Sequence, residues 1–248
     1  MTPHNQEMQP APGEGARVAL VTGSRTGIGR HLSERLLDQG WLVVGCSRKP
    51  AGWEAENYTH LEADVSKEEQ VKAVFRHLIQ HHGRLDALIN CAAAASMNHV
   101  LLTPASTVEK IMGTNVGGTF LLCREAAKLM RKRKFGRIVN FTSAVVPLRL
   151  AGEAVYIASK SAVAALSQVL ARELAEFGIT VNVVGPGLIA TDMLRGVPQA
   201  KIDQVLKSFP LPRMTTMEDV ANVVDFFLRP ESAAVTGQVV YLGGLANG

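Results

Sequence analysis

Three polar side chains in the second half of the chain have the types and the spacing needed for proton transfer. Tyr156 and Lys160 are four residues apart in a helical pattern, so they share one helix face. A free phenol has a pKa of about 10, and a nearby ammonium lowers that pKa and suits the phenol to acid–base work. Ser143 follows an apolar run and can donate a hydrogen bond to a carbonyl oxygen that gains negative charge. Any one tyrosine–lysine pair at this spacing is usually a pair of surface neighbours, so the prediction depends on the other motifs.

A glycine-rich turn near the N-terminus has the context of a nucleotide site. The segment 22–29 reads Thr-Gly-Ser-Arg-Thr-Gly-Ile-Gly, directly follows the apolar run 18–21 and opens a helical pattern. Glycines let backbone amides approach a pyrophosphate at the N-terminus of a helix. The pattern predicts dinucleotide binding through Gly23, Ser24, Arg25, Thr26, Gly27, Ile28 and Gly29.

The end of the second apolar run indicates which dinucleotide is bound. A site for NAD usually has a carboxylate there for the ribose 2′-hydroxyl, whereas this chain has Ser47 and Arg48. Arginine binds a 2′-phosphate bidentately, and Arg25 is available from the glycine turn. These residues favour NADP(H); the alternative is that Arg48 is an ordinary surface residue.

Short apolar runs alternate with helical patterns from Arg17 to Gly244. The runs are continuous, which is typical of a parallel sheet covered on both faces. We expect a single-domain α/β fold of Rossmann type, a doubly wound parallel sheet of about seven strands, over 17–248, after a loose tail at 1–16. Strands are expected at about 18–21, 41–45, 59–63, 85–90, 137–141, 180–184 and 238–242, and helices at about 28–39, 66–81, 108–133, 154–177 and 218–228. Ser66 and Glu69 predict a capping box for the second helix.

Composition excludes several other classes of protein. The chain is 47% hydrophobic with a formal charge of +4, and its first fifteen residues lack the apolar core of a signal peptide. No stretch approaches the ~18 apolar residues that span a bilayer. The cysteines (Cys46, Cys91 and Cys123) lack metal-ligand spacing, so we expect a cytoplasmic protein without a metal. The basic run 131–134 is either a solvated helix end or a contact for an acidic partner, and nothing beside it indicates nucleic-acid binding.

Taken in order, these motifs resemble the short-chain dehydrogenase/reductase family over residues 17–245. The resemblance implies that Tyr156 donates the proton in reduction and that Lys160 holds the nicotinamide ribose and tunes Tyr156. It implies that Ser143 positions the substrate oxygen and that Asn115 supports a water relay. It also implies cofactor contacts at Asp64, Val65, Asn90, Ala92, Pro186, Gly187, Ile189 and Thr191.

One turn departs from the family pattern. The family usually has Asn-Asn-Ala-Gly after the fourth strand, whereas this chain has Asn90-Cys91-Ala92-Ala93. A methyl group at Ala93 restricts the φ angles open to the turn. We expect a tighter pocket rather than loss of binding; the alternative is an impaired site.

Within the family, the segments 137–143, 178–182 and 236–238 are most similar to 3-oxoacyl-[acyl-carrier-protein] reductases. This implies NADPH-dependent reduction of a 3-oxoacyl thioester in fatty acid biosynthesis, docking of an acidic acyl carrier protein, and a homotetramer or dimer. Lys134 fits a basic docking surface, but Phe177 stands where another base is common. Reduction of another ketone, a quinone or a sugar, oxidation of a secondary alcohol, and nucleotide sensing without turnover remain alternatives, because a fold does not identify a substrate.

The segment 188–212 has the composition of a lid over this site. Apolar residues of this segment and of the stretch after Ser143 indicate either an apolar substrate pocket or a lid that packs onto the protein. In the segment these are Ile189, Met193, Leu194, Val197 and Phe209, and after Ser143 they are Val145, Val146 and Leu148. Glu153 lies near Tyr156 and is either solvated or binds a polar or cationic substrate group. An apolar helix face (Val163, Leu166, Val169 and Leu170) is either a subunit interface or core.

Overall fold

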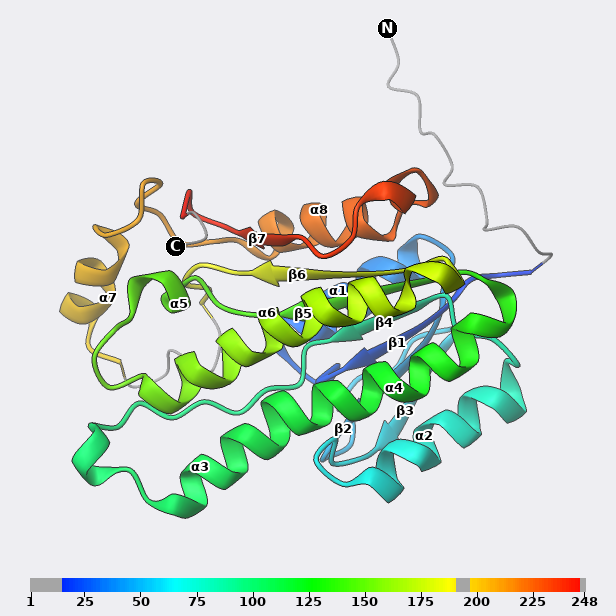
Figure 1. The fold of residues 1–248 in the computed structure, drawn as a ribbon, viewed down its shortest axis with the longest axis horizontal. Helices are drawn as coiled ribbons and strands as arrows, with labels where there is room; N and C mark the ends of the chain where they lie inside the picture. The colour runs from blue at the N-terminus through cyan, green and yellow to red at the C-terminus, as the bar shows by residue number, and fades with distance from the viewer. Residues whose placement is uncertain (1–14, 191–196, 246–248) are drawn as a thin grey trace, which may run out of the picture.

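A seven-stranded parallel sheet forms the centre of the computed structural model, which describes residues 15–190 and 197–245 (Figure 1). The strands run in the spatial order β3-β2-β1-β4-β5-β6-β7, and every neighbouring pair is parallel. Their bounds are β1 (Val18–Thr22), β2 (Leu42–Ser47), β3 (Tyr58–Glu62), β4 (Ala87–Asn90), β5 (Gly136–Phe141), β6 (Ile179–Gly185) and β7 (Val239–Tyr241). The predicted fold class is confirmed.

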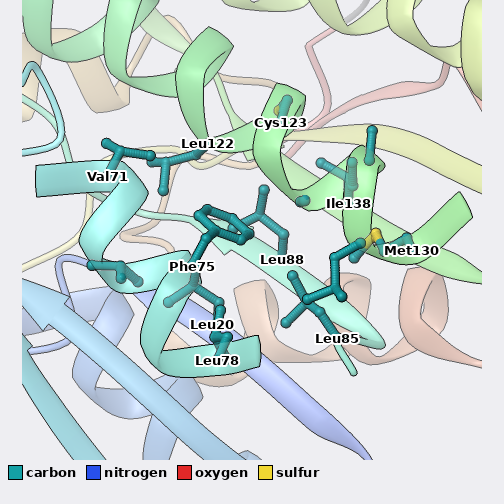
Figure 2. Close-up of a cluster of buried hydrophobic side chains, with 14 of the residues drawn as sticks. Leu20, Val71, Phe75, Leu78, Leu85, Leu88, Leu122, Cys123, Met130 and Ile138 are labelled. Carbon is teal, nitrogen blue, oxygen red and sulfur yellow. The ribbon is translucent and has the colours of Figure 1, made fainter. Parts of the chain in front are cut away.

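Helices cover both faces of this sheet because its strands are apolar on both sides. Leu20 and Leu88 point into the layer formed by α2 (Glu68–His81), α4 (Thr119–Met130) and α6 (Ala154–Leu174). Figure 2 shows Phe75 and Leu78 of α2 packed in this layer. The alternate residues Val21 and Ile89 point into the opposite layer, formed by α1 (Gly27–Asp38) and α8 (Met217–Leu228).

The strand order reverses between β1 and β4, and this reversal positions the site. The chain leaves β1 for α1 on one face and leaves β4 for the helices on the other face. The two connections therefore diverge beyond the carboxyl ends of adjacent strands and leave a crevice, the usual ligand site of such sheets.

The predicted helix over 108–133 is divided. It consists of α3 (Ala105–Met112), a π-helical segment η2 (Gly113–Gly118), α4, and the 3₁₀ turn η3 (Arg131–Arg133). Glycines favour an irregular helix, and single π turns often occur at functional sites. Within residues 15–190 and 197–245, four short elements have no counterpart in the prediction: η1 (Val100–Leu102), α5 (Val145–Leu148), α7 (Gln199–Leu206) and η6 (Pro230–Ala234).

The predicted capping box at Ser66 is wrong. The Ser66 hydroxyl donates to Asp64 Oδ1 at 2.7 Å, and α2 begins after Lys67 with no side-chain cap. Ser66 stabilises the turn that carries Asp64 instead of the helix. The structure has a capping box at α8, where Thr216 and Asp219 bond each other's backbone amides.

The long helix α6 is partly core and partly surface. Val163 is buried and Leu170 packs against the core, whereas Val169 is 52% exposed. Together with η4 (Ala175–Phe177), α6 is the one helix in the described ranges whose length and composition would suffice to cross a membrane. It packs along β5 and β6 of the sheet. The expected tail at 1–16 falls almost wholly outside the described residues.

Candidate active site

Ser143, Tyr156 and Lys160 line one cavity at the carboxyl end of the sheet. Ser143 follows β5, and the other two come from the first turns of α6, which packs along β5 and β6. The Lys160 ammonium lies 5.9 Å from the centre of the Tyr156 ring and donates a 2.9 Å hydrogen bond to the carbonyl of Phe141. The structure therefore brings together the three side chains that the sequence assigns to proton transfer.

Burial sets the acid–base state of this trio. It raises the pKa of Tyr156 to about 12, and hydrogen bonding with Ser143 acts in the opposite direction. Burial also lowers the pKa of Lys160 to about 8. The expectation that the phenol pKa falls below its ordinary value is not met, because burial of the Tyr156 hydroxyl outweighs the influences that lower the pKa. A neutral, protonated Tyr156 is the form that can donate a proton at neutral pH.

Asn115 lies behind this cavity in the π-helical segment and is only 1% exposed. Its side-chain oxygen accepts from the amide of Ala94 at 2.7 Å, and its side-chain nitrogen donates to the Ala94 carbonyl at 2.9 Å. The same nitrogen donates to Ser159 Oγ at 2.9 Å. Asn115 thus fastens the connection after β4 to α6, and its polar side-chain atoms are engaged by protein groups.

The glycine turn forms the floor of a second, larger cleft of about 950 Å³. Gly23 and Gly27 have φ angles of +69° and +58°, which glycine adopts without strain. A Cβ at Gly29 would overlap the carbonyl of Gly23. The first turn of α1 has neither a side-chain cap nor an acidic residue, so its amides are available to an anion. These features fit the pyrophosphate of a dinucleotide.

Basic side chains gather at the other end of this cleft. Arg25, Arg48 and Lys49 line it and are exposed, beside Ser47 at the end of β2. Burial acts to raise the pKa of Asp64, but hydrogen bonds from Ser66 and the charge of Arg48 bring it below its usual value. Asp64 is therefore an ionised acceptor at neutral pH. This end of the cleft fits a nucleoside that carries an additional phosphate.

The two cavities meet at the turn after β4. Ile28, Cys91 and Ala93 line both. Ala93 is absent from the residues with positive φ in the described ranges, so its methyl group imposes no left-handed strain. The amide of Ala92 donates to the Thr22 hydroxyl at 3.0 Å, which ties this turn to the glycine turn. Burial raises the pKa of the Cys91 thiol far above its usual value, so it is held as the neutral thiol.

Most other residues assigned to the cofactor also reach a cavity wall. Thr26, Val65 and Ala92 line the larger cleft, and Pro186, Gly187 and Ile189 line the smaller cavity. Ser24 and Asn90 line neither, because their side chains face the interior and bond Tyr58 and Asn140. Thr191 lies outside the described residues, as do Met193 and Leu194.

The smaller cavity has a largely apolar wall that includes residues the sequence did not single out. They come from the loop after β4, the segment after α5, and α7: Met97, Leu150, Ala151, Lys201, Ile202 and Val205. Val145, Ile189 and Val197 line it as predicted, whereas Val146, Leu148 and Phe209 do not. An apolar period in α7 is the signal that could have identified Ile202 and Val205.

Glu153 is the carboxylate in this wall. It is half-buried, and burial raises its pKa while the charge of Lys201 opposes the rise. Its ionised form also raises the pKa of Tyr156. Glu153 is therefore electrostatically coupled to the proposed proton donor.

Comparisons with known proteins agree with this geometry. A family profile described as enoyl-(acyl carrier protein) reductase matches residues 23–245. The chain is 32% identical to the 3-oxoacyl-[acyl-carrier-protein] reductases of Vibrio cholerae and Escherichia coli, in each case over 92% of this chain and 96% of the relative. The aldohexose dehydrogenase of Thermoplasma acidophilum, solved without ligand, superposes with a TM-score of 0.86 at 29% identity, over 93% of this chain and 94% of that one.

Proposed function

Because the chain belongs to the short-chain dehydrogenase/reductase family and is an oxidoreductase acting on CH–OH groups, we propose that it is an NADPH-dependent carbonyl reductase of 3-oxoacyl thioesters. The observation that carries this proposal is the shared wall of the two cavities. Ile28, Cys91 and Ala93 line both the larger cleft and the cavity of Ser143, Tyr156 and Lys160, so the two cavities adjoin. A dinucleotide in the cleft would reach the proton-donating residues at this wall.

The chain's own residues handle the carbonyl oxygen and its proton. Bound NADPH supplies the hydride. Ser143 donates a hydrogen bond to the oxygen as negative charge develops, and Tyr156 transfers its phenolic proton to that oxygen. The high pKa of Tyr156 keeps the proton in place at neutral pH until the oxygen becomes a strong base. This proton state favours reduction over oxidation at neutral pH.

Lys160 has two tasks in this proposal. Its ammonium is held by the Phe141 carbonyl near the Tyr156 ring, where it can bind ribose hydroxyls and stabilise the phenolate left after proton transfer. Asn115 acts by holding the connection after β4 against α6 through Ala94 and Ser159. A water relay at Asn115 would need an exchange of these hydrogen bonds.

The thioester class rests on the apolar wall and on the relatives. Leu150, Ile202 and Val205 offer an acyl chain apolar contact. The two reductases named above act on 3-oxoacyl groups carried by an acyl carrier protein. An acyl carrier protein that docks at the basic run 131–134 belongs to this proposal, and so does a cytoplasmic location.

Glu153 supports a second candidate, a dehydrogenase of a polyhydroxy substrate. A half-buried carboxylate in an apolar wall is a poor neighbour for an acyl chain and a good acceptor for hydroxyl groups. The structural relative from Thermoplasma acts on an aldohexose.

One experiment separates the two candidates. Oxidation of NADPH is followed with a panel that contains 3-oxoacyl thioesters, simple ketones and quinones, and reduction of NADP⁺ is followed with aldoses and secondary alcohols. The highest kcat/KM is expected for a 3-oxoacyl thioester. A preference for an aldose would contradict the thioester proposal.

A further inference from the structure

The connection between β2 and β3 has an unusual construction. The two strands are parallel neighbours, yet residues 48–57 join them without a helix. Parallel neighbours ordinarily need a longer, helical crossover. Asn57 has a φ of +63°, a left-handed conformation that asparagine tolerates, and it turns the chain into β3.

Two aromatic rings replace the missing helix. Trp53 stacks on Tyr58 with ring centres 4.0 Å apart. The indole nitrogen of Trp53 donates to the carbonyl of Ser24 at 3.2 Å, and the Tyr58 hydroxyl lies 2.9 Å from the Ser24 hydroxyl. A Cβ at position 45 would overlap both hydroxyl groups, so Gly45 makes room for this contact. The short connection thereby packs against the underside of the glycine turn.

His60 joins this cluster to the basic end of the cleft. Its Nδ1 lies 2.8 Å from the Tyr58 hydroxyl, and its Nε2 lies 3.0 Å from Ser47 Oγ and 3.1 Å from the Lys49 carbonyl. The Lys49 carbonyl can only accept, so Nε2 carries a proton and donates. Ser24, Tyr58, His60 and Ser47 then form one chain of hydrogen bonds that ends at Lys49.

Arg48 lies between the two residues that this chain immobilises. Ser47 and Lys49 flank it, the Ser47 hydroxyl donates to the Lys49 carbonyl at 2.6 Å, and Arg48 is exposed to the cleft. A bidentate contact between a guanidinium and a phosphate needs a fixed backbone beneath a long, flexible side chain. His60 is half-buried and lines neither cavity, so it supplies that fixation through the backbone segment and not by contact with the ligand.

We propose that His60 is a positioning residue that preorganises the Ser47–Lys49 segment for the 2′-phosphate of NADP(H), through hydrogen bonds to Ser47 and Lys49. This inference rests on the proposed cofactor preference and deepens it. It predicts that loss of the imidazole weakens the binding of ligands that have a 2′-phosphate and leaves the binding of ligands without one unchanged.

The test measures dissociation constants by calorimetry for NADPH, NADH, adenosine 2′-monophosphate and adenosine 5′-monophosphate. His60→Ala is expected to weaken NADPH and the 2′-monophosphate roughly five- to tenfold, with NADH and the 5′-monophosphate within about twofold. His60→Gln keeps an amide donor for the Lys49 carbonyl and is expected to recover most of the loss. Tyr58→Phe keeps the stacking on Trp53, removes the link to Ser24, and is expected to cause a smaller loss of the same kind.

Three outcomes decide the matter. Equal weakening of NADPH and NADH in both His60→Ala and Tyr58→Phe would reduce His60 to a structural residue and overturn the inference. Unchanged affinities for NADPH and NADH in both variants would also overturn the inference, while the proposed function would stand. A native protein that binds NADPH and NADH equally would contradict the cofactor proposal and this inference together. If His60→Ala does not fold, the selectivity of Tyr58→Phe decides the question alone.

Discussion

The buried ammonium nitrogen of Lys160 lies 5.9 Å from the ring centre of Tyr156 and donates a hydrogen bond to the carbonyl of Phe141. The Lys160 residue is only 4% exposed. A charge in this position costs folding free energy, because burial lowers the pKa of Lys160 from 10.5 to about 8. The residue that the chemistry requires therefore lowers the stability of the folded protein.

Lys160→Met is expected to stabilise the folded protein at pH 7 by on the order of 2 kcal/mol, although it abolishes turnover. Above about pH 8 the folded protein has released a proton that the unfolded chain still binds. The stability of the native protein therefore rises from pH 8 to 10.5, and the advantage of the variant shrinks over that window. Urea denaturation at several pH values measures this. Lys132→Met at an exposed position is the control and should change stability by less than about 0.5 kcal/mol.

The exposed cations of the larger cleft predict cofactor preference. NADPH is expected to bind at least ~10-fold more tightly than NADH, which corresponds to about 1.4 kcal/mol. Arg48→Asp should remove most of that difference by weakening NADPH, with NADH nearly unchanged, and Arg131→Asp on η3 should leave both affinities alone. Equal dissociation constants for the two cofactors in the native protein would contradict this prediction.

Glu153 provides a prediction about pH. Its ionised carboxylate raises the pKa of Tyr156, so Glu153→Gln should lower that pKa. Alcohol oxidation requires the phenolate, so its pH–rate profile should move to lower pH, with a rate at pH 8 raised by roughly twofold or more. Glu153→Asp keeps the charge and serves as the control. A profile of Glu153→Gln that coincides with the native one would show that the two groups are not coupled.

Assembly is predicted from the apolar residues left on the surface of the long helices. Val169 on α6 and Phe120 on α4 are 52% and 43% exposed. We expect a homotetramer or dimer in light scattering at micromolar concentration. Val169→Glu should shift the mass toward smaller species, whereas Ile79→Glu on α2, at a similarly exposed apolar position, should not. A monomeric mass for the native protein would be the contrary result.

The sequence was sufficient for those features that depend on local pattern. Apolar runs predicted the strands other than β3, and the spacing of Tyr156 and Lys160 predicted that both side chains face one cavity. It was insufficient where tertiary contacts decide. Ser66 was expected to cap α2, but its hydroxyl donates to Asp64 in the adjacent turn and the helix begins one residue later, after Lys67.

Burial and long-range hydrogen bonds explain the other differences. The ammonium of Lys160 was expected to lower the pKa of Tyr156, yet desolvation of the phenol dominates once the cavity is formed. The contacts of Asn115 with Ala94 and Ser159, and those of His60 with Ser47, join residues far apart in the chain. No periodicity in a single sequence reports such pairs. The cavity residues of α7 were not predicted because this eight-residue helix is short and lies within the segment 188–212, which was expected to be a lid without a helix.

Tyr156 is the proposed proton donor, and Tyr156→Phe is the sharpest test of this role because it removes only the hydroxyl group. NADPH affinity by calorimetry and turnover on the best substrate of the panel are measured in the same preparation. We expect an affinity within about twofold of the native value and a turnover reduced roughly 10²- to 10⁴-fold, the range expected for loss of a general acid. Near-native turnover in Tyr156→Phe would show that the proton comes from another group and would contradict the assignment.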